Sequence, residues 1–156
     1  MRDRRFVAEH RGGPLKIEQH RQLMRWAIGC AEHVFPLSEG EIDERLNNAI
    51  LVARKWADGN ASVGEARKAA MGAIAVANES SDPVNVAIAR TTGHAVATAH
   101  MADHSLGAAL YALKAIHYKG NSPGPEKKWQ ANQLPIEIKS FILTTFKEKE
   151  KHHSCP

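Results

Sequence analysis

The sequence predicts an all-α protein, a single compact bundle of six or seven helices. Apolar residues recur every three or four positions through most of the chain, which is the period of an amphipathic helix. Helix start signals, in which serine or aspartate precedes glutamate or proline, stand before several of these segments. No segment alternates apolar and polar residues as a strand does, and the best candidate, residues 136–146, has helical spacing.

The composition fits one soluble domain. The chain has 156 residues, 43% of them hydrophobic, which is enough for a single domain over residues 1–156 with a buried core. No apolar run approaches the ~18 residues of a membrane helix, and the N-terminus lacks the apolar core of a signal peptide. We therefore expect a cytoplasmic protein without a membrane partner. Cys30 and Cys155 offer no disulfide framework.

The first helix is predicted over residues 17–34. Residues 1–14 precede it as an extended lead-in, because they are polar and end in a Gly-Gly-Pro turn signal. Pro36 stops the helix, since proline cannot continue its hydrogen bonding. One apolar stripe should face the core, formed by Leu23, Trp26, Ala27, Cys30, Ala31 and Val34.

Two serine-to-glutamate spacings predict the starts of the next two helices. Ser38 and Glu41 have the spacing of a capping box and should open a helix that ends near Asp58. Ser62 and Glu65 repeat that spacing and should open a third helix. The third helix should bury a face of mainly small residues, formed by Val63, Ala66, Ala69, Ala70, Ala73, Ile74 and Ala77.

The Ala- and Gly-rich centre of the chain predicts two closely packed helices. The Asp-Pro pair at residues 82–83 is an N-cap followed by proline at the first helical position. One helix over residues 83–117 would be a rod of roughly 50 Å, too long for a compact domain. We therefore predict a break near Ala102 to Ser105, with Asp103 or Ser105 capping the following helix.

Two further helices should complete the chain. After a loop at residues 121–125, a short helix containing Trp129 should reach Leu134, and Pro135 should start the last helix. Residues 147–156 are predicted to form a frayed, charged tail. The last helix should present one face made of Ile138, Phe141, Ile142, Thr145 and Phe146.

A histidine cluster is the main candidate for chemistry. His100 and His104 are four residues apart, so on a helix both imidazoles could reach zinc or another divalent metal, with Asp103 beside them. Zinc proteases carry glutamate after the first histidine, and Met101 stands there instead. His94 would point about 120° away from His100 on a continuous helix. Structural packing, metal binding and direct contact with a partner all remain open for this cluster.

Other catalytic signals are weak. The sequence has no phosphate-binding glycine loop, no nucleophile elbow and no Cys/His arrangement with supporting spacing, so we expect a protein without catalytic residues or a cofactor. The alternative is a metal-binding protein or metal-dependent hydrolase built on the histidine cluster. A third alternative is weak nucleic-acid binding by the basic first helix, for which a net charge of +4 is modest.

Several residues are candidates for partner contact. Arg45 and Arg90 are expected to face inward, and Trp56 would suit an interface hot spot if its edge were exposed. The Ala-rich faces would also permit a homodimer. The candidate partner-binding residues are His94, His100, Asp103, His104, Trp56 and Arg45.

Short motifs that run along nearly the whole chain carry a family resemblance. The most specific is GHAVATAHMADH at residues 93–104, followed by LGAA and YA. The others are HRGGPL at 10–15, HR at 20–21, WA at 26–27, CAEHV at 30–34, WA at 56–57, EAR at 65–67, WQ at 129–130 and LP at 134–135. Together they resemble a bacterial family labelled "putative immunity protein".

The resemblance implies a small cytoplasmic helical protein that binds and neutralises a cognate toxin protein. It implies no catalytic residues. The sequence departs from the family pattern at residues 46–48, Leu-Asn-Asn, where a more basic stretch with a proline would be expected. The positive net charge favours an acidic or neutral toxin over a nuclease, because inhibitors of nucleases often present an acidic face.

Overall fold

The structure is a computed structural model that describes the backbone of residues 3–153 and the side chains of residues 3–148. Seven α-helices and no strand occur in this range, which confirms the predicted all-α bundle. The helices are α1 (Ile17–Val34), α2 (Glu44–Ala57), α3 (Val63–Glu79), α4 (Pro83–Ala97), α5 (His104–Tyr118), α6 (Gly124–Gln133) and α7 (Ile136–His153).

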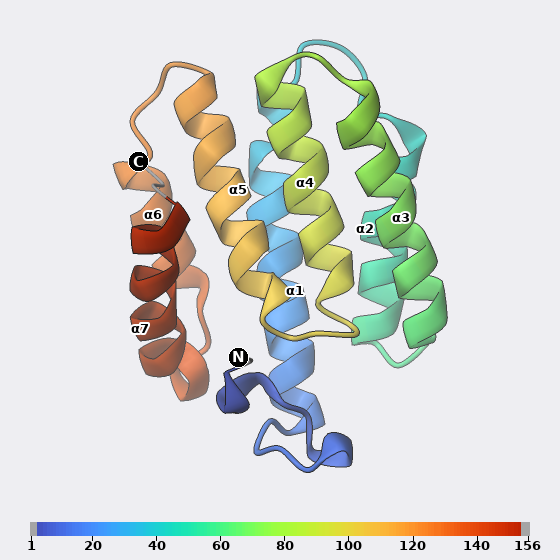
Figure 1. The fold of residues 1–156 in the computed structure, drawn as a ribbon, viewed down its shortest axis with the longest axis vertical. Coiled ribbons are helices and arrows are strands. Elements are labelled where there is room, and N and C mark those ends of the chain that lie inside the picture. Colours follow the sequence, from blue (N-terminus) through green and yellow to red (C-terminus); the bar gives the residue numbers. More distant parts are fainter. Residues whose placement is uncertain (1–2, 154–156) are drawn as a thin grey trace.

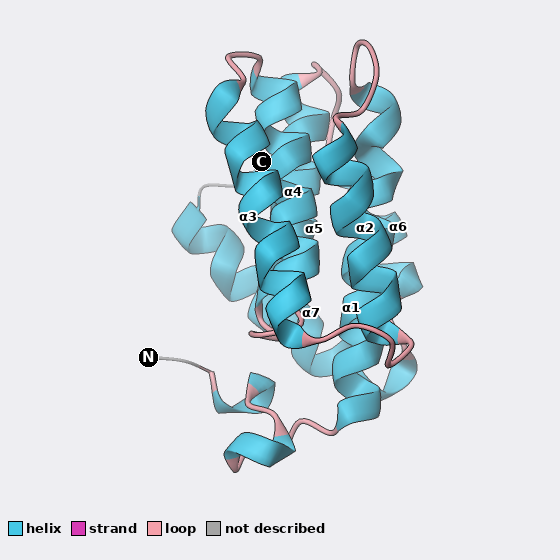
Figure 2. Ribbon diagram, turned by 90° about the vertical axis from the view of Figure 1, so that its right-hand side faces the viewer, coloured by secondary structure: helices cyan, strands magenta, loops and turns pink. Residues whose placement is uncertain are grey.

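The helices α3, α4 and α5 form one layer, and α1 and α2 lie behind it (Figure 1). Helix α4 occupies the middle of the front layer, where it packs against α3 on one side and α5 on the other. Helix α1 packs against α4 and α5, and α2 packs against α3 and α4. Figure 2 shows the two layers from the side. Helices α6 and α7 lie together on the side of α5 that faces away from α4.

Small side chains let α4 approach its neighbours closely. A Cβ atom at Gly93 would lie 3.5 Å from the Cβ of Ala73, which is contact distance between α4 and α3. On the opposite side, the buried Thr91 hydroxyl donates a hydrogen bond of 2.5 Å to the carbonyl oxygen of Ala108 on α5. The Ala- and Gly-rich segment is therefore central because the helices on both sides pack closely against it.

Two of the predicted helix starts are confirmed. The Ser62 hydroxyl accepts a hydrogen bond from the Glu65 N–H, and the Glu65 carboxylate accepts one from the Ser62 N–H, which completes a capping box. The Asp82 carboxylate caps α4 by accepting a hydrogen bond from the Val84 N–H, with Pro83 at the first helical position. Local sequence signals therefore determine both starts.

The predicted capping box at Ser38 is wrong. Helix α2 begins at Glu44, and its cap is Asp43, whose carboxylate accepts a hydrogen bond from the Arg45 N–H. The Ser38 hydroxyl instead donates a hydrogen bond of 3.1 Å to the Asn85 side chain. Gly40 has a φ of 111°, a left-handed conformation that no helix can include, so residues 38–43 cannot continue the predicted helix.

The expected apolar faces are confirmed except at the edges of α3. All six residues of the predicted α1 stripe are buried. On α3 the alanines are buried, but Val63 is 39% and Ile74 is 51% exposed. Because α4 approaches the alanine stripe so closely, the longer side chains on either side of it remain at the surface.

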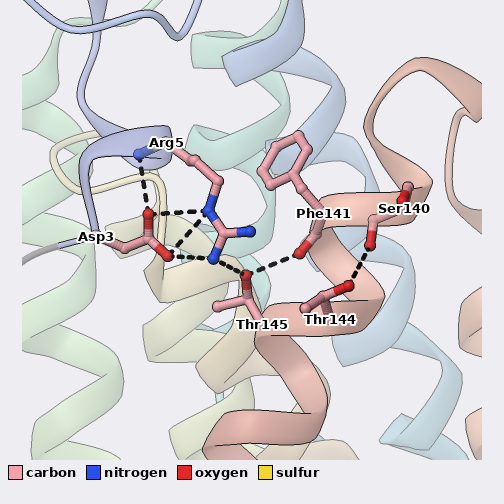
Figure 3. A network of polar contacts seen from close by, with 6 residues as sticks. All are labelled: Asp3, Arg5, Ser140, Phe141, Thr144 and Thr145. Carbon is pink, nitrogen blue, oxygen red and sulfur yellow. Dashed lines mark hydrogen bonds and ion pairs between the residues drawn. The ribbon is translucent and has the colours of Figure 1, made fainter.

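The lead-in folds back against α7. It contains short 3-10 helices at Arg4–Phe6 and Glu9–Arg11, so the expectation of an extended segment is wrong. Figure 3 shows the Arg5 guanidinium between the Asp3 carboxylate, at 2.6 Å, and the Thr145 hydroxyl, at 2.8 Å. Phe6 is fully buried and its ring meets Phe141 edge-on at 5.5 Å.

The C-terminal helix is longer than predicted. Helix α7 continues to His153, so residues 147–153 are helical rather than a frayed tail, and residues 154–156 lie outside the described residues. Ile138, Ile142 and Phe146 are buried at four-residue intervals and hold α7 on the bundle. Among the described residues, no helix is long and apolar enough to cross a membrane.

Candidate functional site

The connection between α4 and α5 is a sharp corner without glycine or proline. Helix α4 ends at Ala97, and residues 98–103 turn the chain before α5 begins at His104. The Thr98 hydroxyl donates a hydrogen bond of 3.1 Å to the His94 carbonyl oxygen. At the other end, the Ser105 hydroxyl bonds the Ala102 carbonyl oxygen at 2.7 Å. Such side-chain bonds to the backbone compete with continued helix, so the turn can form here.

The predicted break near Ala102 to Ser105 is confirmed, but it begins earlier than expected. Helix α4 already stops at Ala97, and α5 begins at His104. Asp103 occupies the N-cap position of α5, but neither its carboxylate nor the Ser105 hydroxyl caps the helix. Within the described chain, the buried Asp103 oxygen Oδ1 has no hydrogen-bond partner. The predicted capping role of these two residues is therefore wrong.

The early break brings His94 next to His104. Their Nδ1 atoms lie 3.0 Å apart, so one ring donates the shared hydrogen and the other accepts it. The His94 ring also stacks on Tyr111 of α5, with centroids 5.2 Å apart and an interplanar angle of 15°. The His100 ring lies 5.2 Å from that of His104. The sequence expectation that His94 points away from the cluster is wrong because α4 and α5 are not one continuous helix.

Gly107 makes room for this arrangement. A Cβ atom at position 107 would lie 2.5 Å from Nδ1 and 2.8 Å from Cγ of His94, well inside contact distance. The His94 ring can therefore rest on the backbone of α5 only because position 107 has no side chain. We call His94, His100, His104 and the turn at residues 98–103 the histidine corner.

Two hollows meet at the histidine corner, and both are lined by His94 and His104. The first, which we call the α3–α4 groove, has a volume of about 310 Å³. Its lining residues are Arg67, Ala70, Met71, Ile74, Arg90, Gly93, His94, Ala97, His100 and His104. The second, which we call the Tyr111 hollow, has a volume of about 260 Å³ and is lined by His94, Met101, Asp103, His104, Gly107, Leu110, Tyr111 and Lys114.

The geometry gives no support to the metal hypothesis. Among the described residues, no group of three or more His, Cys, Asp and Glu side chains is arranged to hold a metal ion. Two of the ring nitrogens in the corner, on His94 and His104, face each other instead of a shared point. What the corner presents is a set of imidazoles beside two shallow hollows, which suits recognition of another molecule.

The whole of this surface lies in a part of the chain that matches a known protein family. A sequence model of the family described as "Imm-5 like putative immunity protein" matches residues 13–137. The chain belongs to this immunity protein family. The matched residues include the complete histidine corner and every residue that lines the two hollows. No curated protein matched the chain, and no solved structure did so either.

Trp56 lies in the core of the protein rather than on its surface. It is 8% exposed, and its ring lies 4.7 Å from that of His20 on α1. His20 in turn makes a buried contact of 2.5 Å from Nε2 to the carbonyl oxygen of Thr98, in the histidine corner. Trp56 therefore supports the corner from behind, through His20.

Arg45 ties α2 to α3 at a distance from the two hollows. Its guanidinium lies 2.9 Å from the Asp43 carboxylate and 2.8 Å from that of Glu79. The side-chain hydrogen bond from Arg45 lowers the pKa of Asp43 to about 2. Arg45 is partly buried, with 41% of its side chain exposed, and pairs with Asp43 as a half-buried structural residue. Arg90 is exposed, so the expectation that it faces inward is wrong.

A second cluster joins α1 to α6. The His33 ring stacks on Trp129 with centroids 3.6 Å apart, and its Nδ1 lies 2.7 Å from the buried Glu126 carboxylate. Cys30 is fully buried one turn earlier on α1, and burial raises the pKa of its thiol well above the usual value. A thiol that stays protonated is a poor nucleophile. The contacts of His33 with Trp129 and Glu126 join α1 to α6.

Of the residues that line the two hollows, the sequence predicts only His94, His100, Asp103 and His104 as site residues. Arg67 and Tyr111 stood only in family motifs, Met71 had no distinguishing motif, and Ile74 was assigned to the core. One signal was present: Arg67, Met71 and Ile74 follow each other at helical spacing, beside the alanine stripe of α3. A helix with two such stripes faces two environments, the core and a surface.

Proposed function

We propose that the chain is an immunity-type inhibitor that binds a cognate toxin protein and neutralises it by contact, without catalysis. Family membership supports the immunity role. The proposed contact surface is the histidine corner together with the α3–α4 groove. The observation that carries this choice is the grouping of exposed Met71 and Ile74 with Arg67, Arg90 and the three histidines around one groove.

The composition of this surface resembles that of protein interfaces. Met and Arg are enriched in interface cores, and an apolar patch rimmed by polar side chains commonly marks a binding site. Met71 is 70% exposed, and this exposure of an apolar side chain does not stabilise a monomer. The buried position of Trp56 favours the groove over the alternative surface around that residue.

A cytoplasmic site of action accompanies this proposal, because an inhibitor must meet its toxin inside the cell that makes both.

The test is co-expression with the toxin encoded beside this gene. Growth should be rescued, and the two purified proteins should form a complex. Growth arrest in the presence of the chain, together with the absence of a complex, would refute the proposal.

Nucleic-acid binding by the first helix has less support. Arg21 lies 3.1 Å from Glu18, and Arg25 lies 3.4 Å from Asp58, so part of the basic stripe already faces carboxylates. A nucleic-acid site needs cations that are available to phosphates. If such binding exists, its affinity should fall steeply with salt, and titration of duplex and single-stranded DNA at low salt measures this directly.

A further inference from the structure

The α3–α4 groove carries charge of one sign. Arg67 and Arg90 are its only formally charged lining residues among those the structure describes, and the others are apolar residues, a glycine and the three histidines. The nearest carboxylate of the histidine corner, Asp103, lines the neighbouring Tyr111 hollow instead. A ligand in this groove therefore meets two guanidinium groups and no opposing acid.

Arg67 and Arg90 stand toward opposite ends of the groove. Helices α3 and α4 are antiparallel neighbours joined by residues 80–82 (Figure 1). Gly93 lies level with the stretch from Ala70 to Ile74 on α3. Arg67 precedes that stretch on α3 and Arg90 precedes Gly93 on α4, so the two lie in opposite directions, with backbones on the order of 10 Å apart along the helix axes.

Neither groove arginine has a carboxylate partner among the residues that the structure describes. By contrast, Arg54 pairs with Glu32 and Arg45 with two acids. Both groove arginines are exposed. Their charge is therefore available to a partner.

Two apolar side chains lie between the levels of the two arginines. Met71 and Ile74 lie on α3 between the levels of Arg67 and Arg90, and they are 70% and 51% exposed. A phosphate backbone would cover these side chains with charge and gain nothing from them. A peptide segment that carries an aliphatic or aromatic side chain would bury them.

We propose that the α3–α4 groove binds an acidic amphipathic segment of the toxin. One carboxylate pairs with Arg67 and another with Arg90, and an apolar side chain between them packs on Met71 and Ile74. Two carboxylates seven residues apart on a helix are roughly 10 Å apart, which is of the same order as the separation of the two arginine backbones along the helix axes. Guanidinium groups bind carboxylates in a bidentate manner, so both pairs also fix the orientation of the segment. This inference rests on the proposed binding of a toxin.

The test measures binding between the purified chain and an inactivated form of the toxin encoded beside its gene, by titration calorimetry. The double substitution R67E/R90E should weaken binding by roughly 100-fold, because each reversal removes an attraction and adds a repulsion. The matched control K55E/K68E changes the net charge equally on α2 and on another face of α3, and should stay within about 3-fold of the unchanged protein. All four positions are exposed, so both variants should fold, and circular dichroism verifies this.

Two further measurements identify the chemistry of the occupant. Raising the salt concentration from roughly 50 to 500 mM should weaken binding by the unchanged protein more than binding by R67E/R90E. The double substitution M71S/I74S should weaken binding at both salt concentrations. Arginine substitutions at the contacting carboxylates of the toxin should restore binding to R67E/R90E.

The outcomes separate this inference from the proposed function. If the unchanged chain binds the toxin and R67E/R90E binds equally well, the inference is overturned and the proposed function stands. If the unchanged chain does not bind the toxin at all, both are overturned. If sedimentation shows a homodimer that R67E/R90E or M71S/I74S dissociates, a second copy of the chain occupies the groove and the inference is likewise overturned.

Discussion

Gly107 is the residue on which the shape of the histidine corner depends most directly. Its missing side chain lets the His94 ring lie against α5, where it contacts both His104 and Tyr111. Without that space the three rings could not share one surface. The sequence indicated which residues matter, because His100, Asp103 and His104 mark the corner. It did not indicate the directions of their side chains, because those depend on where α4 stops.

The substitution Gly107→Ala should destabilise the protein. Overpacking costs about 1–3 kcal/mol, against a gain in helix propensity of roughly 1 kcal/mol. The added Cβ should also displace His94 from His104. Urea unfolding measures the stability, and the histidine ring resonances report the contact.

Gly64→Ala is the matched control for that experiment. Position 64 lies in the first turn of α3, and a Cβ atom there would meet only the Ser62 hydroxyl, at 3.8 Å. This variant should be as stable as the unchanged protein or more so. Equal stability of the two alanine variants would contradict the assigned role of Gly107.

Asp43 should titrate with a pKa of about 2, below its ordinary value of 3.8, mainly because Arg45 donates hydrogen bonds to it. A carboxyl group whose pKa is lowered by folding stabilises the folded state above the unfolded pKa, and this stabilisation is lost as the pH falls toward 2. Arg45→Met should raise the pKa toward 3.8, as measured by NMR titration. Arg54→Met, which removes the partner of Glu32, should leave the Asp43 pKa unchanged.

At the scale of helices, the sequence determined most starts and fewer ends. The starts of α3 and α4 were predictable because Ser62 and Asp82 make local cap contacts that depend on a few neighbouring residues. The start of α2 was not, because Ser38 bonds to Asn85, a residue 47 positions away. The early end of α4 was missed for the same reason: Thr98 is fixed in part by His20 from α1, which no local pattern reveals.

Ser62 and Ser38 offer a direct comparison of a true cap with an apparent one. Ser62→Ala should cost about 1 kcal/mol of unfolding free energy, because the first turn of α3 loses its capping hydrogen bond. Ser38→Ala should cost clearly less, since its hydroxyl caps no helix and its bond to Asn85 is only partly buried. Chemical denaturation of the two variants tests this. An equal or larger loss for Ser38→Ala would contradict the assignment of α2.

At the scale of the whole molecule, the lead-in and the last helix hold each other in place. Phe6 is buried against Phe141, and Arg5 reaches Thr145, so residues 140 positions apart in the sequence form one contact (Figure 3). The sequence predicted an apolar face on the last helix but not its contact with the lead-in, because a contact of this length leaves no periodic pattern. The α3–α4 groove was missed for a related reason, since two helices, α3 and α4, supply its rims.

Phe6→Ala should therefore loosen both ends of the chain. Loss of a buried phenylalanine costs about 3–5 kcal/mol, and the amide protons of α7 should exchange faster. Arg4→Ala is the control, since Arg4 is exposed in the same short 3-10 helix, two residues before Phe6; it should change stability by less than about 0.5 kcal/mol. Thermal unfolding and hydrogen exchange of the free protein provide both readouts. Unchanged exchange in α7 of Phe6→Ala would show that the lead-in does not support that helix.

In the proposed function, the chain binds its toxin through the α3–α4 groove and the histidine corner. Hydrogen–deuterium exchange of the chain, alone and in complex with the inactivated toxin encoded beside its gene, tests this proposal. We expect new protection in α3 from Arg67 to Ile74, in the second half of α4, and at residues 98–103. Protection confined to α6 and α7, or to the α2 surface around Arg45, would contradict it.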